Sequence, residues 1–91
     1  MPSWTEEAAD DLEAILDYIA ADNPQAAAET VREIEVACNR LDRFPNLGRP
    51  GAVPGTREIV LPRLPYLVVY RTTPGRPTIL RVLHGKMRWP G

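Results

Sequence analysis

Apolar residues recur at helical spacing through the first twenty positions of the chain. The residues that form this stripe are Ala8, Leu12, Ile15 and Ile19, and acidic residues occupy half of the positions between them. A period of three to four residues predicts an amphipathic helix with one buried face. Thr5 or Ser3 can cap its N-terminus, because a hydroxyl oxygen there accepts a hydrogen bond from the first turn.

A short polar interruption separates this helix from a second one. Asn23 is suited to the N-cap, and Pro24 suits the first helical position, where its missing N–H costs no hydrogen bond. The second apolar stripe consists of Ala27, Val31, Ile34, Cys38 and Leu41. We expect this helix to run to about Asp42 or Arg43 and to form an antiparallel helical hairpin with the first.

Beyond Phe44 the helical period disappears and strands are predicted. Proline and glycine crowd residues 45–55, which indicates a long irregular connection. Runs rich in Val, Ile, Leu and Tyr then predict strands at residues 57–61, 66–71 and 78–84. The residues before Thr5 can add an N-terminal strand. We expect Phe44 and Leu47 to fill the core rather than to bind a partner.

These elements predict a single α+β domain over residues 1–91. Its N-terminal helical hairpin would pack on a small, mainly antiparallel β-sheet. A chain of 91 residues can bury roughly 60–65% of the surface that its unfolded form exposes. One core is therefore feasible, and a partner that covers further apolar surface would add stability.

Cysteine usage and the N-terminal residues favour a cytoplasmic location. Cys38 is the only cysteine, which excludes an internal disulfide and a cysteine-rich zinc site, and its helical position predicts a packing role. Met1 is followed by polar and acidic residues, so no secretory signal is visible. The longest strongly apolar run, at residues 66–70, is too short to span a bilayer. We expect no association with a membrane.

The net charge of −1 conceals opposite charges in the two halves of the chain. Residues 1–46 hold three bases and eleven acids, a net of 3 − 11 = −8, whereas residues 47–91 hold eight bases and one acid, a net of 8 − 1 = +7. This division indicates a basic surface for an anionic partner, either nucleic acid or an acidic protein segment. The alternative is that the acids only solvate the helices while the arginines line the sheet.

The chain carries no motif for conventional hydrolytic or metal chemistry. It has no glycine-rich phosphate loop and no HExxH, GxSxG or CxxC sequence, and His84 is its only histidine. We therefore assign no catalytic residue, no metal site and no cofactor. The second half instead combines arginines with Tyr66, Tyr70 and Trp89, residues that can bind phosphates and bases or anchor a protein interface.

The order of these features resembles the RelE/ParE family of toxins over essentially the whole chain. The matching landmarks are Trp4 before the acidic helix, FPNLGR at residues 44–49, REI at 57–59, YLVVYR at 66–71 and RVLHGK at 81–86. The resemblance implies the toxin of a type II toxin–antitoxin pair. It also implies neutralisation by a cognate, ParD-like antitoxin whose C-terminal segment wraps the helices and sheet, and contact with operator DNA only through that antitoxin.

Within this family the resemblance favours the ParE branch. Positions that carry the basic catalytic residues of RelE hold Glu58, Val60, Leu67 and Met87 here, and no tyrosine follows before Gly91. An acid and three apolar side chains cannot stabilise the charge of a phosphorane. We therefore expect a non-covalent inhibitor of DNA gyrase rather than an enzyme. The alternatives are a ribosome-dependent mRNA endoribonuclease and a homologue that retains only operon regulation.

Two sets of residues are candidates for binding. Those for the target are Arg57, Arg71, Arg81, Lys86, Arg88 and Trp89. Those for an antitoxin groove are Leu12, Ile15, Ile19, Tyr66, Val68 and Tyr70. A strand arginine can instead pair with a helix acid such as Asp17 and hold the hairpin on the sheet. For His84 we expect a structural role.

Overall fold

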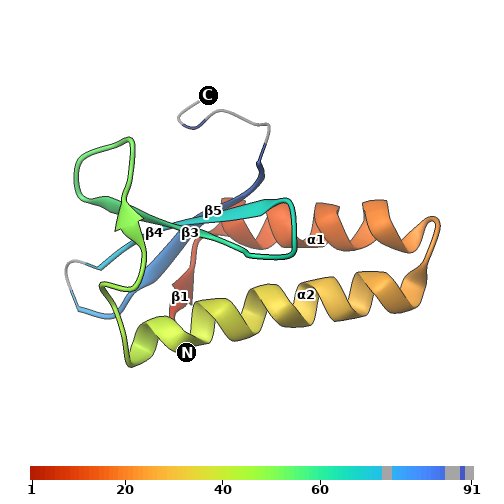
Figure 1. Ribbon diagram of the computed structural model, residues 1–91, viewed down its shortest axis with the longest axis horizontal. Helices are drawn as coiled ribbons and strands as arrows, with labels where there is room; N and C mark the ends of the chain where they lie inside the picture. The colour runs from red at the N-terminus through yellow and green to blue at the C-terminus, as the bar shows by residue number, and fades with distance from the viewer. Residues whose placement is uncertain (73–74, 86–88, 90–91) are drawn as a thin grey trace.

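The computed structural model describes residues 1–72, 75–85 and 89, and it has two helices packed against one face of a five-stranded sheet (Figure 1). In chain order the elements are β1 (Ser3–Trp4), α1 (Glu6–Ala20), α2 (Pro24–Asn39), the 3-10 turn η1 (Arg40–Asp42), β2 (Arg49–Pro50), β3 (Thr56–Val60), β4 (Tyr66–Arg71) and β5 (Thr78–His84). This arrangement confirms the predicted α+β class. Among the described residues, no helix is long and apolar enough to cross a membrane.

The caps that the sequence predicted are present at both helices. The Thr5 hydroxyl accepts a hydrogen bond from the Ala8 N–H at 3.1 Å and donates one to the Leu80 carbonyl of β5 at 3.0 Å. Thr5 rather than Ser3 is therefore the N-cap of α1, and its hydroxyl also joins the helix to the sheet. At α2 the Asn23 side chain accepts from the Ala26 N–H at 3.1 Å, and Pro24 is the first helical residue.

The second helix is shorter than predicted. It ends at Asn39, and η1 continues the chain to Asp42. The reason is the hydrogen bond from the Arg43 N–H to the carbonyl of Arg40, three residues back, which tightens the last turn. This geometry closes the helix before the connection to the sheet begins.

The sheet has the strand order β1-β5-β4-β3-β2, with β1 parallel to β5 and the other pairs antiparallel. The strands β4 and β5 have the predicted bounds, β3 begins and ends one residue earlier than predicted, and the N-terminal strand is present. A bulge interrupts the β4–β5 pairing between Val69 and Tyr70. Sequence reasoning missed β2, because two residues within a stretch rich in proline and glycine show no alternation.

The core lies between the helical hairpin and the sheet. The largest of its fully buried side chains are Tyr70, Ile34, Leu41, Ile79, Val68 and Cys38. The packing role predicted for Cys38 is therefore confirmed.

The prediction that Phe44 and Leu47 fill the core is wrong, since their side chains are 58% and 52% exposed. Both belong to a turn outside the core, in which the Phe44 N–H donates to the Arg40 carbonyl and the Leu47 N–H to the Phe44 carbonyl. Leu41, which is completely buried, is the apolar side chain that enters the core at this end of α2.

Candidate binding surfaces

Arg81 joins the sheet to the first helix. Its guanidinium donates two hydrogen bonds to the carboxylate of Asp11, at 2.7 and 3.0 Å, and the Val82 N–H donates to the same carboxylate at 2.9 Å. These side-chain hydrogen bonds raise the pKa of Arg81. The structural alternative for a strand arginine thus holds for Arg81, with Asp11 rather than Asp17 as the acid. Its guanidinium is therefore engaged by a helix acid within the fold.

Arg57 and Arg49 hold the long connection against β3. The Arg57 guanidinium donates to the carbonyl of Gly48 at 2.7 Å. Arg49 donates to the carboxylate of Glu58 at 3.2 and 3.3 Å, and the Ala52 N–H donates to the other oxygen of that carboxylate at 3.2 Å. Glu58 is only 9% exposed, and its charge is compensated by the ion pair with Arg49, whose own side chain is 62% exposed. Two more of the basic residues therefore have structural contacts.

Tyr70 lies beneath the same connection. Its hydroxyl donates to the carbonyl of Pro45 and accepts from the N–H of Gly48, both at 2.8 Å, while its ring is completely buried. Any atom beyond the Cα of Gly48 would meet the tyrosine ring, because an added Cβ would lie 2.8 Å from it. The glycine is therefore required by this close approach.

Five of the six residues proposed for an antitoxin groove belong to the core or pack against it. Tyr66, Val68 and Tyr70 are 8%, 0% and 0% exposed, which removes them from any surface groove in this conformation. Leu12 and Ile15 are partly buried and pack against the same core, and Ile19 is partly buried near the end of α1. The correction has a simple cause. Alternation in a strand and helical spacing in a helix identify the side of the element that is buried. Here the buried side of β4 faces the helical hairpin, and the buried side of α1 faces the sheet.

The candidates for target binding differ in their exposure and in their contacts. Arg71 is exposed at the end of β4, and Trp89 is half-buried near the C-terminus. Arg57 and Arg81 have the internal contacts described above. Lys86 and Arg88 lie outside the described residues.

The sheet face away from the helices carries few charges in its centre. Strand pairing aligns Glu58, Val69 and Arg81 across it, and aligns Val60, Leu67 and Leu83 in the next row. Val69 and Leu83 are buried and Leu67 is half-buried. In the first row Glu58 is paired with Arg49, and Arg81 is paired with Asp11. This face thus offers two compensated charges and an apolar row.

His84 packs against Tyr66 at the end of the sheet. The two rings meet edge to face, with centroids 5.8 Å apart and planes at 84°. Burial raises the pKa of the Tyr66 hydroxyl, with a smaller contribution from Tyr18. These contacts support the structural role expected for His84.

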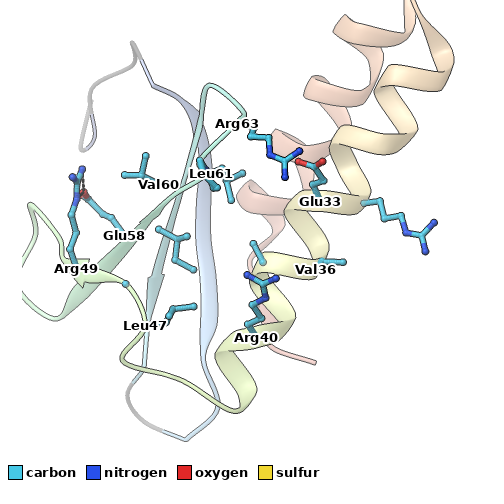
Figure 2. A pocket seen from close by; sticks show the side chains of 14 residues that line it. Glu33, Val36, Arg40, Leu47, Arg49, Glu58, Val60, Leu61 and Arg63 are labelled. Atoms are coloured by element: carbon cyan, nitrogen blue, oxygen red, sulfur yellow. Dashed lines mark hydrogen bonds and ion pairs between the residues drawn. The ribbon is translucent and has the colours of Figure 1, made fainter.

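A cleft of about 640 Å³ opens between the C-terminal half of α2, the connection to β2, and β3 (Figure 2). Three apolar side chains that line it are unusually exposed, namely Val36 at 47%, Leu47 at 52% and Val60 at 55%. Sequence reasoning did not select Val36 or Val60 as partner contacts. The available signal was that Val36 falls outside the apolar stripe of its helix and therefore cannot face the core.

Arginines surround this cleft. The charged residues around it are Arg32, Arg40, Arg49, Arg63, Glu33 and Glu58, a net of 4 − 2 = +2. The Arg49–Glu58 pair compensates itself, and the side chains of Arg63 and Glu33 point toward one another (Figure 2). Among the described residues, no acid forms an ion pair with Arg32 or Arg40. The cleft is therefore apolar in its walls and cationic at its rim.

Comparison with known proteins places this architecture in a family. The family model for the ParE toxin of the parDE type II toxin–antitoxin system matches residues 3–89. The protein Y4kP of Sinorhizobium fredii, which carries the name of a toxin, is 41% identical over 96% of this chain and 90% of its own length. Toxin RelE2 of Caulobacter vibrioides is 33% identical over 89% of this chain and 90% of its own.

A solved structure gives the same result for the fold. A chain of the chromosomal ParDE toxin–antitoxin system from P. aeruginosa superposes with a TM-score of 0.80 and 34% sequence identity, covering 90% of this chain and 91% of that one. The family match extends over nearly the whole domain and agrees with the resemblance seen in the sequence. The chain therefore belongs to the ParE toxin family of type II toxin–antitoxin systems.

Proposed function

We propose that this ParE-family toxin acts by binding DNA gyrase non-covalently and trapping its cleavage complex with DNA. The observation that carries the proposal is the pairing of Glu58 on the sheet face. Its carboxylate lies where RelE-type enzymes, by the sequence resemblance, place a basic residue, and it is held there by Arg49 and the Ala52 N–H. A carboxylate that is already paired with an arginine supplies no positive charge, so it cannot stabilise the added negative charge of a phosphorane.

The positions of the arginines also support binding rather than cleavage. An active site built from cations would need several of them to converge on one phosphate. Arg57 instead bonds to the Gly48 carbonyl, Arg81 bonds to Asp11 at the opposite side of the sheet, and Arg63 lines the cleft beside α2. These three guanidinium groups therefore have separate partners or surroundings.

The alternative, a ribosome-dependent mRNA endoribonuclease, is tested in the same experiment. Purified gyrase would be assayed for DNA supercoiling with and without this protein, and a ribosome translation mixture would be assayed for cleaved message. We expect supercoiling to be inhibited, cleaved DNA to accumulate, and the message to stay intact. Cleaved message with unaffected gyrase would replace this proposal with ribonuclease activity.

We further propose that a cognate antitoxin neutralises this chain by covering the helical hairpin and the cleft beside it. The support is the cleft itself, in which exposed apolar side chains lie beside Arg32 and Arg40, which form no ion pair among the described residues. Hydrogen exchange would be compared with and without the antitoxin encoded beside the gene. We expect added protection in α2, and unchanged exchange there would contradict this placement.

A further inference from the structure

Polar side chains form a row across one end of the sheet, on the face away from the helices. Its members occupy four adjacent strands, and the strand register pairs each with the next, which places them on one face. From β3 to β1 they are Thr56, Arg71, Thr78 and Ser3. Ile79 and Tyr70, their neighbours along the strands, are completely buried in the core. Because side chains alternate along a strand, the members of this row, here called the polar row, point away from the hairpin.

The polar row holds donor groups that have no partner in the described part of the chain. Arg71 is exposed and forms no ion pair among the described residues. Thr78 and Ser3 are half-buried, and neither hydroxyl forms a hydrogen bond with another described residue. The Thr56 hydroxyl differs, since it donates to the Val53 carbonyl at 2.6 Å. A guanidinium and two hydroxyls are therefore available to a ligand on this face.

The strands of the polar row carry little negative charge. Residues 47–91 hold eight bases and one acid, Glu58. The Glu58 carboxylate is paired with Arg49, so it does not neutralise Arg71. On the other side of the row, Glu6 and Glu7 are exposed in the first turn of α1, which follows β1. An anionic ligand is thus attracted over β3, β4 and β5 and repelled beside α1.

We propose that the polar row binds the sugar–phosphate backbone of DNA. The Arg71 guanidinium pairs with one phosphate, and the hydroxyls of Thr78 and Ser3 donate to neighbouring phosphate oxygens. Arginine and hydroxyl side chains are common donors to phosphates in protein–DNA complexes. The proposal rests on the proposed function, and it assigns this face of the toxin to the DNA that gyrase holds rather than to gyrase itself.

The shape and composition of the row favour a DNA backbone over a protein surface. Adjacent strands lie about 4.8 Å apart, so the row extends about 10 Å from Arg71 to Ser3. A DNA strand carries one phosphate per about 3.4 Å of helix axis, so more than one phosphate can lie over the row. The row contains no wholly apolar side chain, whereas protein interfaces bury an apolar centre. Its donors therefore suit a repeating series of phosphates.

The first test measures binding of a fluorescently labelled DNA duplex to the purified toxin at a series of salt concentrations. Arg71→Gln removes one phosphate contact, so the slope of log affinity against log salt should become shallower by about 0.9. At low salt we expect about tenfold weaker binding, the effect of losing a hydrogen bond to a charged group. Arg71→Lys should keep the slope. Thr78→Val should weaken binding at an unchanged slope, because the hydroxyl is neutral.

Gln25→Glu is the matched control for charge. It lowers the net charge by one, as Arg71→Gln does, but Gln25 is exposed in the first turn of α2. The turn between α1 and α2 and the strand β2 lie at opposite ends of the longest axis of the domain (Figure 1). An acid is also tolerated at this position, near the positive end of the helix dipole. We expect Gln25→Glu to bind the duplex with the wild-type slope, and thermal unfolding would show that every variant folds.

The second test identifies what the row contacts in the complex with gyrase. A photoreactive amino acid would replace Thr78 in one protein and Gln25 in another, and each would be irradiated with gyrase and labelled DNA. We expect position 78 to cross-link to DNA and position 25 not to. Inhibition of supercoiling should require about tenfold more Arg71→Gln than Gln25→Glu, because the phosphate contact contributes to the trapped complex.

The outcomes separate this inference from the proposed function. If gyrase is unaffected by wild type but the duplex binds with an Arg71-dependent slope, the DNA contact is supported and only gyrase inhibition is overturned. If wild type inhibits gyrase while Arg71→Gln and Gln25→Glu behave alike in both assays, the DNA contact alone is overturned. Cross-links from position 78 to gyrase but not to DNA would assign the row to a protein surface. Cross-links to message in a ribosome mixture, and none to DNA, would assign it to RNA, and either result overturns the proposal.

Discussion

The hydroxyl of Tyr70 accepts a hydrogen bond from the backbone N–H of Gly48 at 2.8 Å, across 22 residues of sequence. The same hydroxyl donates to the Pro45 carbonyl, so one buried side chain satisfies two backbone groups of the irregular connection. This connection forms one wall of the cleft through Leu47 and Gly48. The shape of the cleft therefore depends on a tyrosine in the middle of the sheet.

Removing this hydroxyl should destabilise the domain. Tyr70→Phe keeps the ring in place but leaves the Gly48 N–H and the Pro45 carbonyl without their partner. Buried polar groups left unsatisfied cost about 1–3 kcal/mol each, so we expect a loss of that order in the free energy of unfolding. Urea denaturation would measure it. Tyr18→Phe is the control, since Tyr18 is 81% exposed and its loss should have little effect.

We also expect that Gly48 cannot be replaced by a residue with a side chain without a loss of stability. A Cβ at this position would lie 2.7 Å from the Glu58 carbonyl oxygen and 2.8 Å from the Tyr70 ring. We expect Gly48→Ala to cost about 1–3 kcal/mol in stability, because overpacking forces the backbone to shift. At Gly85 the nearest atom to a Cβ is 3.5 Å away, an ordinary contact. Equal thermal stability of Gly48→Ala and Gly85→Ala would contradict this account.

The contact between Gly48 and Tyr70, which holds the connection in place, shows what could and could not be predicted from the sequence. Gly48 lies within FPNLGR and Tyr70 within YLVVYR, and both segments were recognised as landmarks of the family. The contact between them depends on the fold, because 22 residues of irregular chain and strand separate the two positions. The helices and the three long strands followed from the pattern of apolar residues, and the caps followed from residue type; both are local properties. Contacts between residues that lie far apart in the sequence could not be predicted in this way.

The same distinction explains the errors at the binding surfaces. Val68 and Tyr70 were selected for a groove because they alternate on one face of a strand, and that face proved to be the core. Val36 and Val60 were overlooked because they fall outside the regular stripes. In a domain whose core is already filled, apolar residues outside the pattern are better indicators of a partner surface than those within it.

The ion pair between Asp11 and Arg81 should stabilise the contact of α1 with the sheet. The side chains are only 17% and 27% exposed, and the carboxylate also accepts from the Val82 N–H. Asp11→Ala would leave this N–H and the guanidinium without their acceptor. We expect a loss of about 1.5–3 kcal/mol, as for hydrogen bonds to charged groups.

A double-mutant cycle with Arg81→Ala would isolate the pair from other effects. Asp10→Ala is the matched control, because the neighbouring acid is exposed and forms no ion pair among the described residues. Additive losses for Asp11→Ala and Arg81→Ala would show that the two side chains are not coupled.

Cys38 should make the domain less stable at alkaline pH. Burial, with a smaller contribution from Glu35, raises the pKa of its thiol from 9.0 to about 12. Between these values the unfolded chain loses the thiol proton while the folded chain keeps it. The resulting stabilisation is complete below pH 9 and falls as pH rises, by at most about 1.4 kcal/mol per pH unit.

Urea denaturation at a series of pH values from 8 to 11 would measure this slope. Cys38→Ala should have a shallower decline than wild type, because the alkaline titration of all other groups is common to both proteins. A thiol reagent should also modify the native protein only as fast as the domain unfolds, since the thiol is completely buried. Identical slopes for the two proteins would show that Cys38 does not contribute.

We expect the C-terminal residues to bind the target rather than the antitoxin. Lys86, Arg88 and Trp89 combine cations with an aromatic side chain, the composition typical of binding hot spots. We expect the triple alanine variant to lose inhibition of gyrase supercoiling while retaining its thermal stability and antitoxin affinity, because the cleft is formed by α2, β3 and the connection between them. The control variant, Arg76→Ala, removes an exposed arginine from another part of the chain. Full inhibition by the triple variant would exclude these residues from the mechanism and leave Arg71 as the exposed candidate.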